Sequence, residues 1–390
     1  MNFVYLSPHF PPNYYLFCVH LRRLGVNVLG VAGEPYDLLH PELQTALTEY
    51  YRVTDLHNYD ELVRALGYLT HGYGKLDRLD SHNEYWLETE ARLRTDFNIE
   101  GFHVSDLARI KRKSEMKKVF EKAGIAAARG QIVRSAEQVR AFVAEVGYPL
   151  VAKPDIGVGA NKTYKINNAQ ELDAFLAIKP LADYILEEFV AGTIQTFDGL
   201  TDQQGNIVFY ASHQYSQGVM ETVNDDSDVY YFSQREIPHD LAQAGQTIVK
   251  AFGVRERFFH FEFFRLPDQR LVALEVNMRP PGGLTTDMFN FANDLDVYRE
   301  WANVVVNNRF EAKFAWAFHC AYVGRKLNKQ YVRSSEQVLA EFGEWIVHHQ
   351  PISGVFAPAL GDYGYLIRSP RLDDIIRVAE LIQEKEGGAR

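Results

Sequence analysis

The sequence is poor in cysteine and has no long apolar run, and each absence argues against a class of protein. Its two cysteines, Cys18 and Cys320, lie far apart and lack the spacing of metal ligands. A disulfide framework is therefore disfavoured, and a reducing compartment fits best. No stretch reaches the roughly 18 uninterrupted apolar residues of a membrane-spanning helix, and residues 1–10 lack the basic start and apolar run of a signal peptide. We therefore expect a cytoplasmic protein.

Positive charge is also in short supply. The chain has 41 lysines and arginines against 51 aspartates and glutamates, which gives a formal net charge of −10. Nucleic acids and anionic membranes attract proteins with a positive surface, so neither is expected as a partner. A small anion is still compatible with this charge, because a local basic pocket and a metal ion can hold it.

Two common nucleotide-binding motifs are missing as well. No Gly-x-x-x-x-Gly-Lys-Ser/Thr sequence occurs, and no Gly-x-Gly-x-x-Gly follows the first apolar run at residues 3–6. The second absence disfavours an oxidoreductase that would bind a dinucleotide on an N-terminal sheet.

The pattern of apolar residues divides the chain into three regions. In residues 1–108 short apolar runs alternate with amphipathic segments, which predicts a small parallel sheet with helices on its faces. Residues 109–308 combine a basic helix at 111–123 with several strands, and residues 309–390 are rich in strands. The expected fold class is mixed, α/β and α+β, with an N-terminal doubly wound parallel sheet, a central domain and a small C-terminal lobe.

The most informative pattern is a predicted hairpin at residues 258–279. Two β-rich runs flank a turn-forming cluster at 267–270. If the middle two residues of the cluster form the loop, Glu262 pairs directly with Glu275, and both side chains project from one face of the sheet. A register error of one residue would move every side chain to the other face.

Further polar residues follow in phase with Glu275. The strand period of two places Asn277 and Arg279 on the same face. Two carboxylates and an amide oxygen, without histidine or cysteine, suit magnesium or manganese rather than zinc. An exposed hairpin face would explain the two glutamates alone, but the amide and guanidinium in phase favour a metal site. The residues predicted to point to a core on the opposite face are Val272, Leu274 and Val276.

Lysines and glycines supply a second pattern. Lys153 ends an apolar strand, where an ammonium without a partner would be costly. Gly157 and Gly159 follow within six residues, so that backbone N–H groups can approach a phosphate closely. Taken alone, Lys153 also fits an exposed strand end, and Lys113 in its basic cluster fits a solvated helix face.

In this order along the chain, these segments resemble the ATP-grasp superfamily, and specifically its carboxylate–amine ligase and biotin-carboxylase-like branch. The resemblance covers almost the whole chain. It implies a pre-ATP-grasp domain at 1–108, a two-lobed ATP-grasp domain at 109–308 with a glycine-rich lid at about 154–163, and a C-terminal lobe at 309–390. It also implies ATP and Mg²⁺ as cofactors, with Mn²⁺ as an alternative metal.

The resemblance also gives roles to single residues. Lys113 and Lys153 are expected to bind the phosphates of ATP, and Arg279 is expected to lie beside the transferring phosphoryl group as the catalytic cation. The strand end at 187–190 resembles the hinge that binds adenine. The nucleotide-binding set is Lys113, Lys153, Gly157, Gly159, Ala160, Glu187, Glu188, Phe189 and Val190, and the metal-binding set is Glu262, Glu275 and Asn277.

One position departs from the family pattern. Relatives usually carry a glutamate two residues after the glycine that follows the hinge, where it contacts the nucleotide. This chain has Ile194 at that position, followed by Gln195. We therefore expect Asp198 or Gln195 to hold the ribose, or a lower affinity for the nucleotide.

Through this resemblance we expect an ATP-dependent ligase that joins a small-molecule carboxylate to an amine through an acyl phosphate, with amino acids among the candidate substrates. A purine-pathway or biotin-carboxylase-like enzyme would share the ATP site, and a non-catalytic ATP-binding regulator is a further alternative. The acidic segment 213–228 is a candidate for the acceptor side, although a mobile loop is the simpler interpretation. A homodimer is left open as the assembly.

Overall fold

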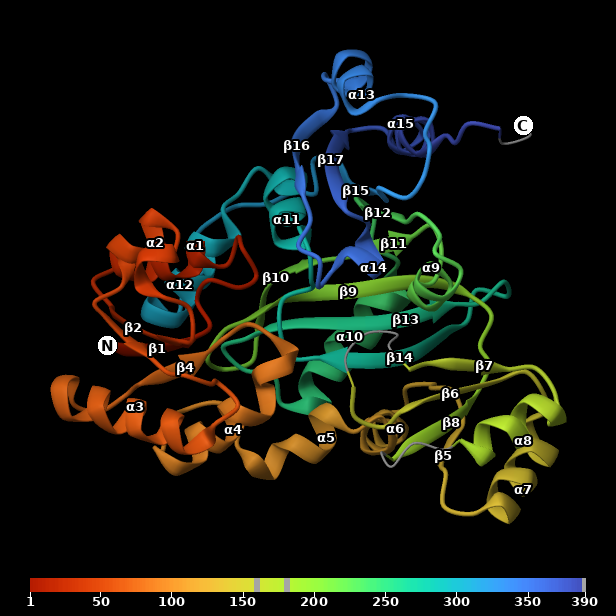
Figure 1. The fold of residues 1–390 in the computed structure, drawn as a ribbon, viewed down its shortest axis with the longest axis horizontal. Helices are drawn as coiled ribbons and strands as arrows, with labels where there is room; N and C mark the ends of the chain where they lie inside the picture. Colours follow the sequence, from red (N-terminus) through yellow and green to blue (C-terminus); the bar gives the residue numbers. More distant parts are fainter. Residues whose placement is uncertain (158–161, 179–182, 388–390) are drawn as a thin grey trace.

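The structure is a computed structural model that describes residues 1–157, 162–178 and 183–387, with residues 219–221 described by their backbone alone. The predicted lid residues Gly159 and Ala160 therefore lie outside the described residues. Within the described ranges, no helix has the length and apolar character needed to cross a membrane. The chain builds a parallel sheet, a small antiparallel sheet and a large antiparallel sheet (Figure 1).

The N-terminal region forms the parallel sheet. Its elements are β1 (Asn2–Leu6), α1 (Tyr15–Arg23), β2 (Asn27–Ala32), η1 (Tyr36–Leu38), α2 (Pro41–Ala46), β3 (Glu49–Arg52), α3 (Tyr59–Tyr73), β4 (Arg78–Asp80), η2 (Glu84–Trp86) and α4 (Leu87–Asp96). The strand order is β3–β2–β1–β4. Neighbouring side chains of β1 point to opposite faces, because Phe3 packs with Phe17 of α1 and Val4 with Leu62 of α3. Helices on both faces confirm the predicted doubly wound sheet.

A helical linker leads to the small antiparallel sheet. Its elements are η3 (Val104–Asp106), α5 (Leu107–Lys111), α6 (Lys113–Lys122), β5 (Gly130–Ile132), α7 (Ala136–Val146), β6 (Leu150–Pro154), β7 (Tyr164–Ile166), α8 (Ala169–Ala177) and β8 (Tyr184–Glu188). The strand order is β5–β8–β6–β7. Helices α7 and α8 cover the face that is turned away from the large sheet, and Phe142 and Phe175 pack there (Figure 1).

The predicted helix at 111–123 is wrong at its start. Arg112 has an extended backbone (φ −89°, ψ 118°) that separates α5 from α6. The cause is Asp155, whose carboxylate accepts a hydrogen bond of 2.8 Å from the Ser114 N–H in the first turn of α6. A carboxylate at a helix N-terminus satisfies free N–H groups and complements the helix dipole. Asp155 thereby ties the small sheet to the helix that carries Lys113.

The large antiparallel sheet contains strands from both the central and the C-terminal regions. Its strand order is β14–β13–β9–β11–β12–β15–β17–β16, with β10 beside β9. Tyr231 pairs with Tyr322, so the sheet continues across the predicted boundary at 308. The elements are β9 (Thr193–Thr201), β10 (Ile207–Ala211), β11 (His213–Tyr215), α9 (Val219–Asn224), β12 (Tyr230–Ser233), α10 (His239–Phe252), β13 (Phe258–Arg265), β14 (Leu271–Asn277), α11 (Thr285–Asn293), α12 (Val297–Asn307), β15 (His319–Arg325), α13 (Ser335–Phe342), β16 (Ile346–Pro351), α14 (Ala357–Leu360), β17 (Tyr363–Ser369) and α15 (Leu372–Gln383).

The β13–β14 hairpin has the predicted pairing, but it reaches that pairing differently. Glu262 pairs with Glu275. The loop holds three residues rather than two, because Leu266 and Arg270 pair through a 2.9 Å hydrogen bond and Gln269 adopts a left-handed φ of 67°. A β-bulge between Glu262 and Phe263 compensates for the extra loop residue.

The bulge changes which side chains of β14 face the core. Val276 packs in the core beneath the large sheet, as predicted, and Ala273 joins it there. Leu274 instead lines a pocket, and Val272 borders a second surface hollow. The predicted core position of Leu274 is therefore wrong, since a bulge reverses the alternation of the residues that precede it, whereas Val272 is buried as predicted.

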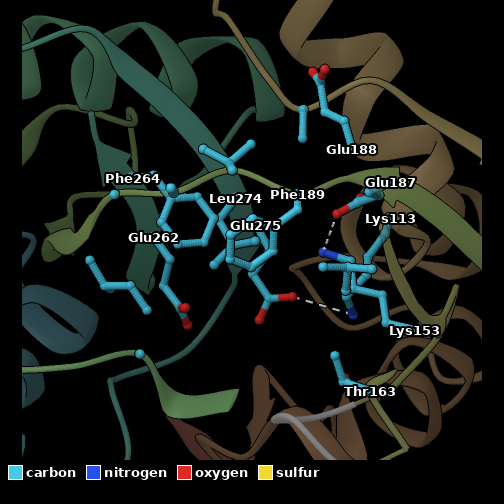
Figure 2. Close-up of a pocket in the computed structure, with 17 residues that line it drawn as sticks. Lys113, Lys153, Thr163, Glu187, Glu188, Phe189, Glu262, Phe264, Leu274 and Glu275 are labelled. Carbon is cyan, nitrogen blue, oxygen red and sulfur yellow. Dashed lines mark ion pairs between the residues drawn. The ribbon is translucent and has the colours of Figure 1, made fainter. Parts of the chain in front are cut away.

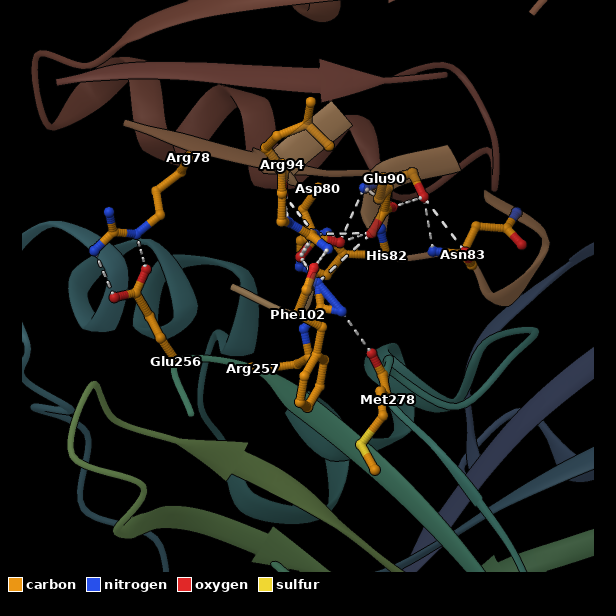
Figure 3. A network of polar contacts seen from close by, with 12 residues as sticks. Arg78, Asp80, His82, Asn83, Glu90, Arg94, Phe102, Glu256, Arg257 and Met278 are labelled. Atoms are coloured by element: carbon orange, nitrogen blue, oxygen red, sulfur yellow. Dashed lines mark hydrogen bonds and ion pairs between the residues drawn. The ribbon is translucent and has the colours of Figure 1, made fainter. Parts of the chain in front are cut away.

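Charged side chains join the N-terminal sheet to the hairpin (Figure 3). The Arg94 guanidinium contacts Glu90 at 2.8 Å and donates to the Leu79 carbonyl at 2.6 Å. Arg257 is the residue directly before β13. Its guanidinium binds the Asp80 carboxylate and donates a hydrogen bond of 3.1 Å to the Met278 carbonyl. This interface network therefore anchors the end of β14 to the end of β4.

Candidate active site

A cavity of about 390 Å³ lies between the small sheet and the β13–β14 hairpin. One wall comes from Val151 and Lys153 of β6, and another from the segment 188–192 that follows β8. Figure 2 shows Glu262 and Glu275 on one side of the cavity and Lys113 and Lys153 on the other. The structure thus brings together residues that are far apart in the sequence and that were predicted to share one site.

Lys153 has the partner that its buried position requires. Its ammonium lies 2.7 Å from one carboxylate oxygen of Glu187, and the ammonium of Lys117 lies 2.8 Å from the other. Burial raises the pKa of Glu187, but Lys153 and Lys117 outweigh it and hold this pKa below its usual value. The Glu187 side chain, which also lines the cavity, therefore holds two lysines, and sequence analysis had missed Lys117.

Lys113 faces the β13–β14 hairpin. Its ammonium lies 3.3 Å from a Glu275 oxygen and donates to the Gly157 carbonyl at 3.3 Å. Burial lowers the pKa of Lys113, yet Glu275 raises it above its usual value overall. Burial likewise opposes the charge of Glu275, but Lys113 and Lys153 lower its pKa to about 2. Both groups are therefore charged at neutral pH, and the start of the lid lies beside them.

The predicted metal ligands lie along one face of the hairpin. Glu262 and Glu275 face each other across the strands, and the Asn277 amide lies 3.4 Å from Glu275. Within the described residues, no cluster of three or more His, Cys, Asp or Glu is arranged to hold a metal. The donor set of two carboxylates and one amide oxygen fits Mg²⁺, which keeps several positions for water or phosphate oxygens.

Histidine also contacts this set, which the sequence analysis did not foresee. The His260 Nε2 lies 3.2 Å from Glu262, and its Nδ1 lies 2.6 Å from Asp198. Asp198 also contacts His213 at 2.8 Å and is fully buried. Asp198 therefore lies beside the hairpin, on the adjacent strand β9, between two histidines.

The ribose assignments of the sequence analysis do not fit this geometry. Asp198 pairs with His260, two strand positions beyond Glu262 and four residues from Ile194, and a strand rises about 3.3 Å per residue. It is therefore roughly 13 Å past the hinge end of the cavity. Gln195 points to the other face of β9, where it contacts Gln214 at 3.3 Å. Ile194 itself lines the cavity.

The hinge segment contributes mainly apolar surface and backbone. Phe189 and Val190 line the cavity beside Ala191. The Glu188 carboxylate is held by Arg129 through a 2.6 Å contact and a 2.8 Å hydrogen bond from the Arg129 N–H. Its side chain is therefore engaged at the rim, and a base edge would meet the backbone of this segment.

Arg279 leads to a second polar region that the sequence analysis missed. Its Nε lies 3.9 Å from Glu84, which follows β4 in the N-terminal region. Glu84 is buried, and one of its oxygens has no hydrogen-bond partner among the described residues. Burial raises the pKa of Glu84, although Arg279 opposes the shift. Its place after the carboxyl end of a parallel strand was the available signal, because ligands bind at that edge.

The acidic segment 213–228 is held in place by lysines. Asp226 lies 2.6 Å from Lys326, and Asp228 lies 3.2 Å from Lys329. Gly218, from the same segment, lines the cavity. The interpretation as a mobile acidic loop is therefore not favoured by these contacts, which connect the segment to the C-terminal lobe.

Comparison with known proteins identifies the domain around this cavity. Residues 146–287 match the family model of the ATP-grasp domain. The L-amino acid ligase from Bacillus licheniformis has a similar structure, with a TM-score of 0.75 and 15% identity over 98% of this chain and 97% of that chain. The chain therefore has the ATP-grasp fold, and residues 146–287 are the part that matches the ATP-grasp family model.

Two curated proteins are similar in sequence to part of the chain. The chain is 21% identical over 248 residues to the L-arginine-specific L-amino acid ligase of Bacillus subtilis, across 60% of this chain and 58% of that protein. It is 26% identical over 201 residues to the carbamoyl phosphate synthase large chain of Bifidobacterium longum, across 49% of this chain. The match spans 18% of that relative's length. The chain thus spans little more than half the length of the first of these relatives and less than a fifth of the second.

Proposed function

We propose that this chain is an ATP-dependent ligase that activates a carboxylate as an acyl phosphate and transfers it to an amine, releasing ADP and phosphate. The observation that carries the proposal is a cavity with two lysines on one side and two paired glutamates on the other. Phosphoryl transfer needs positioned positive charge around the transferred group. The amino acid ligases among the similar proteins support this class of reaction.

The charged residues have separate tasks in this proposal. Lys113 and Lys153 bind phosphate oxygens, after exchanging part of their contacts with Glu275 and Glu187. Arg279 follows the end of β14, two residues after Asn277, and its guanidinium neutralises charge on the transferred phosphoryl group. The metal set is Glu262, Glu275 and Asn277, and a bound Mg²⁺ would supply further positive charge at the phosphates.

We infer that an amino acid is among the substrates. Arg279 can bind a carboxylate with its guanidinium, and Glu84 offers a carboxylate oxygen beside it. A positive and a negative group 3.9 Å apart match the two charged ends of a zwitterion.

The test is a phosphate-release screen with ATP, Mg²⁺ and pairs of amino acids, run on the wild type and on Glu275→Ala. We expect release above the ATP-only background for some pairs in the wild type and none in the variant. Equal phosphate release by the wild type and the variant with every pair of amino acids would contradict the ligase proposal. ATP binding without phosphate release under any pair would favour a regulator instead.

A biotin-carboxylase-like or purine-pathway reaction is distinguished in the same screen. Bicarbonate or a ribosylamine phosphate replaces the amino acids in parallel wells. Glu84→Gln serves as a matched variant, because it keeps the shape of the side chain and removes its charge. If Glu84 meets an amino acid, the variant raises the KM for that substrate while the affinity for ATP stays unchanged.

A further inference from the structure

The wall between the hinge and the metal-binding carboxylates is apolar. Ile194 of β9 pairs with Phe264 of β13, and both side chains line the cavity. Leu274, turned into the cavity by the β-bulge, lies on the same side. Val151 and Ala128 belong to the lining that the small sheet contributes. Figure 2 shows Phe264 and Leu274 grouped on one side, above Glu262.

Strand pairing fixes the order of these residues along the cavity. The register pairs Thr196 with Glu262, and Ile194 with Phe264 one step closer to the hinge. Two residues of strand span about 7 Å. The sugar of a nucleotide joins a base at the hinge to phosphates at Glu262. It must therefore cross the part of the wall formed by Ile194 and Phe264.

The carboxylates that line the cavity are engaged elsewhere. Glu187 is held by Lys153 and Lys117, and Glu188 by Arg129. Glu262 and Glu275 belong to the metal end. Gln195, next to Ile194, contacts Arg265 at 3.2 Å on the opposite face of the strand. Among the described residues, the wall at Ile194 and Phe264 therefore presents hydrocarbon to the sugar, and the side-chain hydroxyl in the lining, that of Thr163, comes from beside β7 of the small sheet.

We propose that this site selects its nucleotide by base and phosphates and does not discriminate at the 2′-hydroxyl, with Ile194 as the residue that sets this tolerance. The ligand class is adenine nucleoside triphosphates with either ribose or 2′-deoxyribose. The inference rests on the proposed function, because it assumes that the cavity binds ATP. Discrimination against a missing hydroxyl requires a site group that bonds to it.

The experiment measures the dissociation constants of ATP and 2′-deoxy-ATP by calorimetry, with Mg²⁺ and without the second substrates. For the wild type we expect the two constants to agree within about threefold. Ile194→Glu adds a carboxylate acceptor at the sugar and should raise the preference for ATP to about tenfold. Ile194→Val is the matched control, and its ratio should equal that of the wild type.

Each outcome is decisive. A wild-type preference for ATP of tenfold or more would overturn the inference while leaving the proposed function intact. An unchanged ratio in Ile194→Glu, with a normal melting transition, would remove Ile194 as the determinant. If Ile194→Glu fails to fold, Ile194→Gln replaces it, since a neutral amide also accepts a hydrogen bond. Binding of neither nucleotide to the wild type would overturn the proposed function, and this inference with it.

Discussion

The cavity and the domain interface both bury opposite charges, yet they hold them differently. At the interface, Arg94 contacts Glu90 at 2.8 Å and also donates to the Leu79 carbonyl, so most of its donors have partners (Figure 3). In the cavity, Lys113 lies 3.3 Å from Glu275 and borders open space. Charged side chains whose hydrogen-bonding groups all have partners fix the relative positions of two regions. Charged side chains with longer contacts can exchange a protein partner for a ligand.

The local electrostatics follow the same division. At the interface, burial raises the pKa of Asp80, but Arg257 outweighs it and keeps this carboxyl ionised. Burial raises the pKa of its neighbour Glu90. Breaking a saturated pair leaves a buried charge without compensation. Removing a charge from the cavity should instead affect ligand binding more than folding.

The largest expected effect comes from Arg257→Met, which removes the link between Asp80 and the Met278 carbonyl. We expect the free energy of unfolding to fall by about 3–5 kcal/mol, as for other broken buried ion pairs. Urea denaturation measures it. The exposed neighbour Arg255 supplies the control, because Arg255→Met should change stability by less than about 0.5 kcal/mol. Similar losses in both variants would contradict a specific role of the interface network.

Glu262→Gln tests the cavity side of the comparison. It keeps the shape of the side chain but weakens the proposed metal ligand, so the Mg²⁺ concentration for half-maximal phosphate release should rise up to about 100-fold. The control is Glu256→Gln at the interface, where Glu256 binds Arg78 at 2.9 Å. That variant should lose stability and keep its Mg²⁺ dependence. A normal Mg²⁺ requirement in Glu262→Gln would refute the metal assignment.

His82 allows the interface to be tested by pH. Burial lowers its pKa from 6.5 to about 4, with Asp80 opposing. Between pH 6.5 and 4, the His82 imidazole is therefore protonated in the unfolded chain but neutral in the folded chain. The free energy of unfolding should fall as the pH drops through this window. Between pH 7 and 5 this amounts to about 2 kcal/mol.

The measurement compares urea denaturation of the wild type and His82→Asn at both pH values. Asparagine tolerates the left-handed φ of 57° at this position. The variant should lose less stability between pH 7 and 5 than the wild type. An identical pH dependence would show that His82 titrates alike in both states of the chain.

The smallest expected effect is a difference in ATP affinity between variants of two lysines, Lys117 and Lys153, that both contact Glu187. Lys153 lines the cavity, whereas Lys117 contacts Glu187 from outside it and donates to the Ala128 carbonyl at 2.6 Å. We expect Lys117→Met to weaken ATP binding by less than about tenfold, and Lys153→Met to weaken it more, because only Lys153 faces the phosphates. Calorimetry with ATP ranks them. The reverse order would mean that Lys117 is the phosphate ligand.

Local patterns in the sequence predicted much of the fold. The alternation of apolar runs and amphipathic helices in residues 1–108 was enough to predict the parallel sheet, and the β-rich runs around 267–270 were enough to predict the hairpin. The continuation of the sheet from β12 to β15 was not predictable in this way. Strand order between distant segments depends on packing that no local period records.

The site was predictable where its residues follow one strand and not where they meet across the fold. Glu262, Glu275 and Asn277 share a hairpin, so a period of two relates them. Glu84 and Lys117 reach the site from other elements, and nothing near them in sequence marks a partner. Gln195 was a different case, because its adjacency to Ile194 already places it on the opposite face of β9.

The hairpin carries two length changes that depend on one another. The third residue of the loop and the bulged residue near Leu274 together leave Glu262 opposite Glu275. Deleting Gln269 alone would shorten the loop and shift the pairing register of the two strands by one residue. The same deletion combined with removal of Leu274 would preserve the pairing of the two glutamates. A change in the length of this loop therefore has to be matched by a change at the bulge.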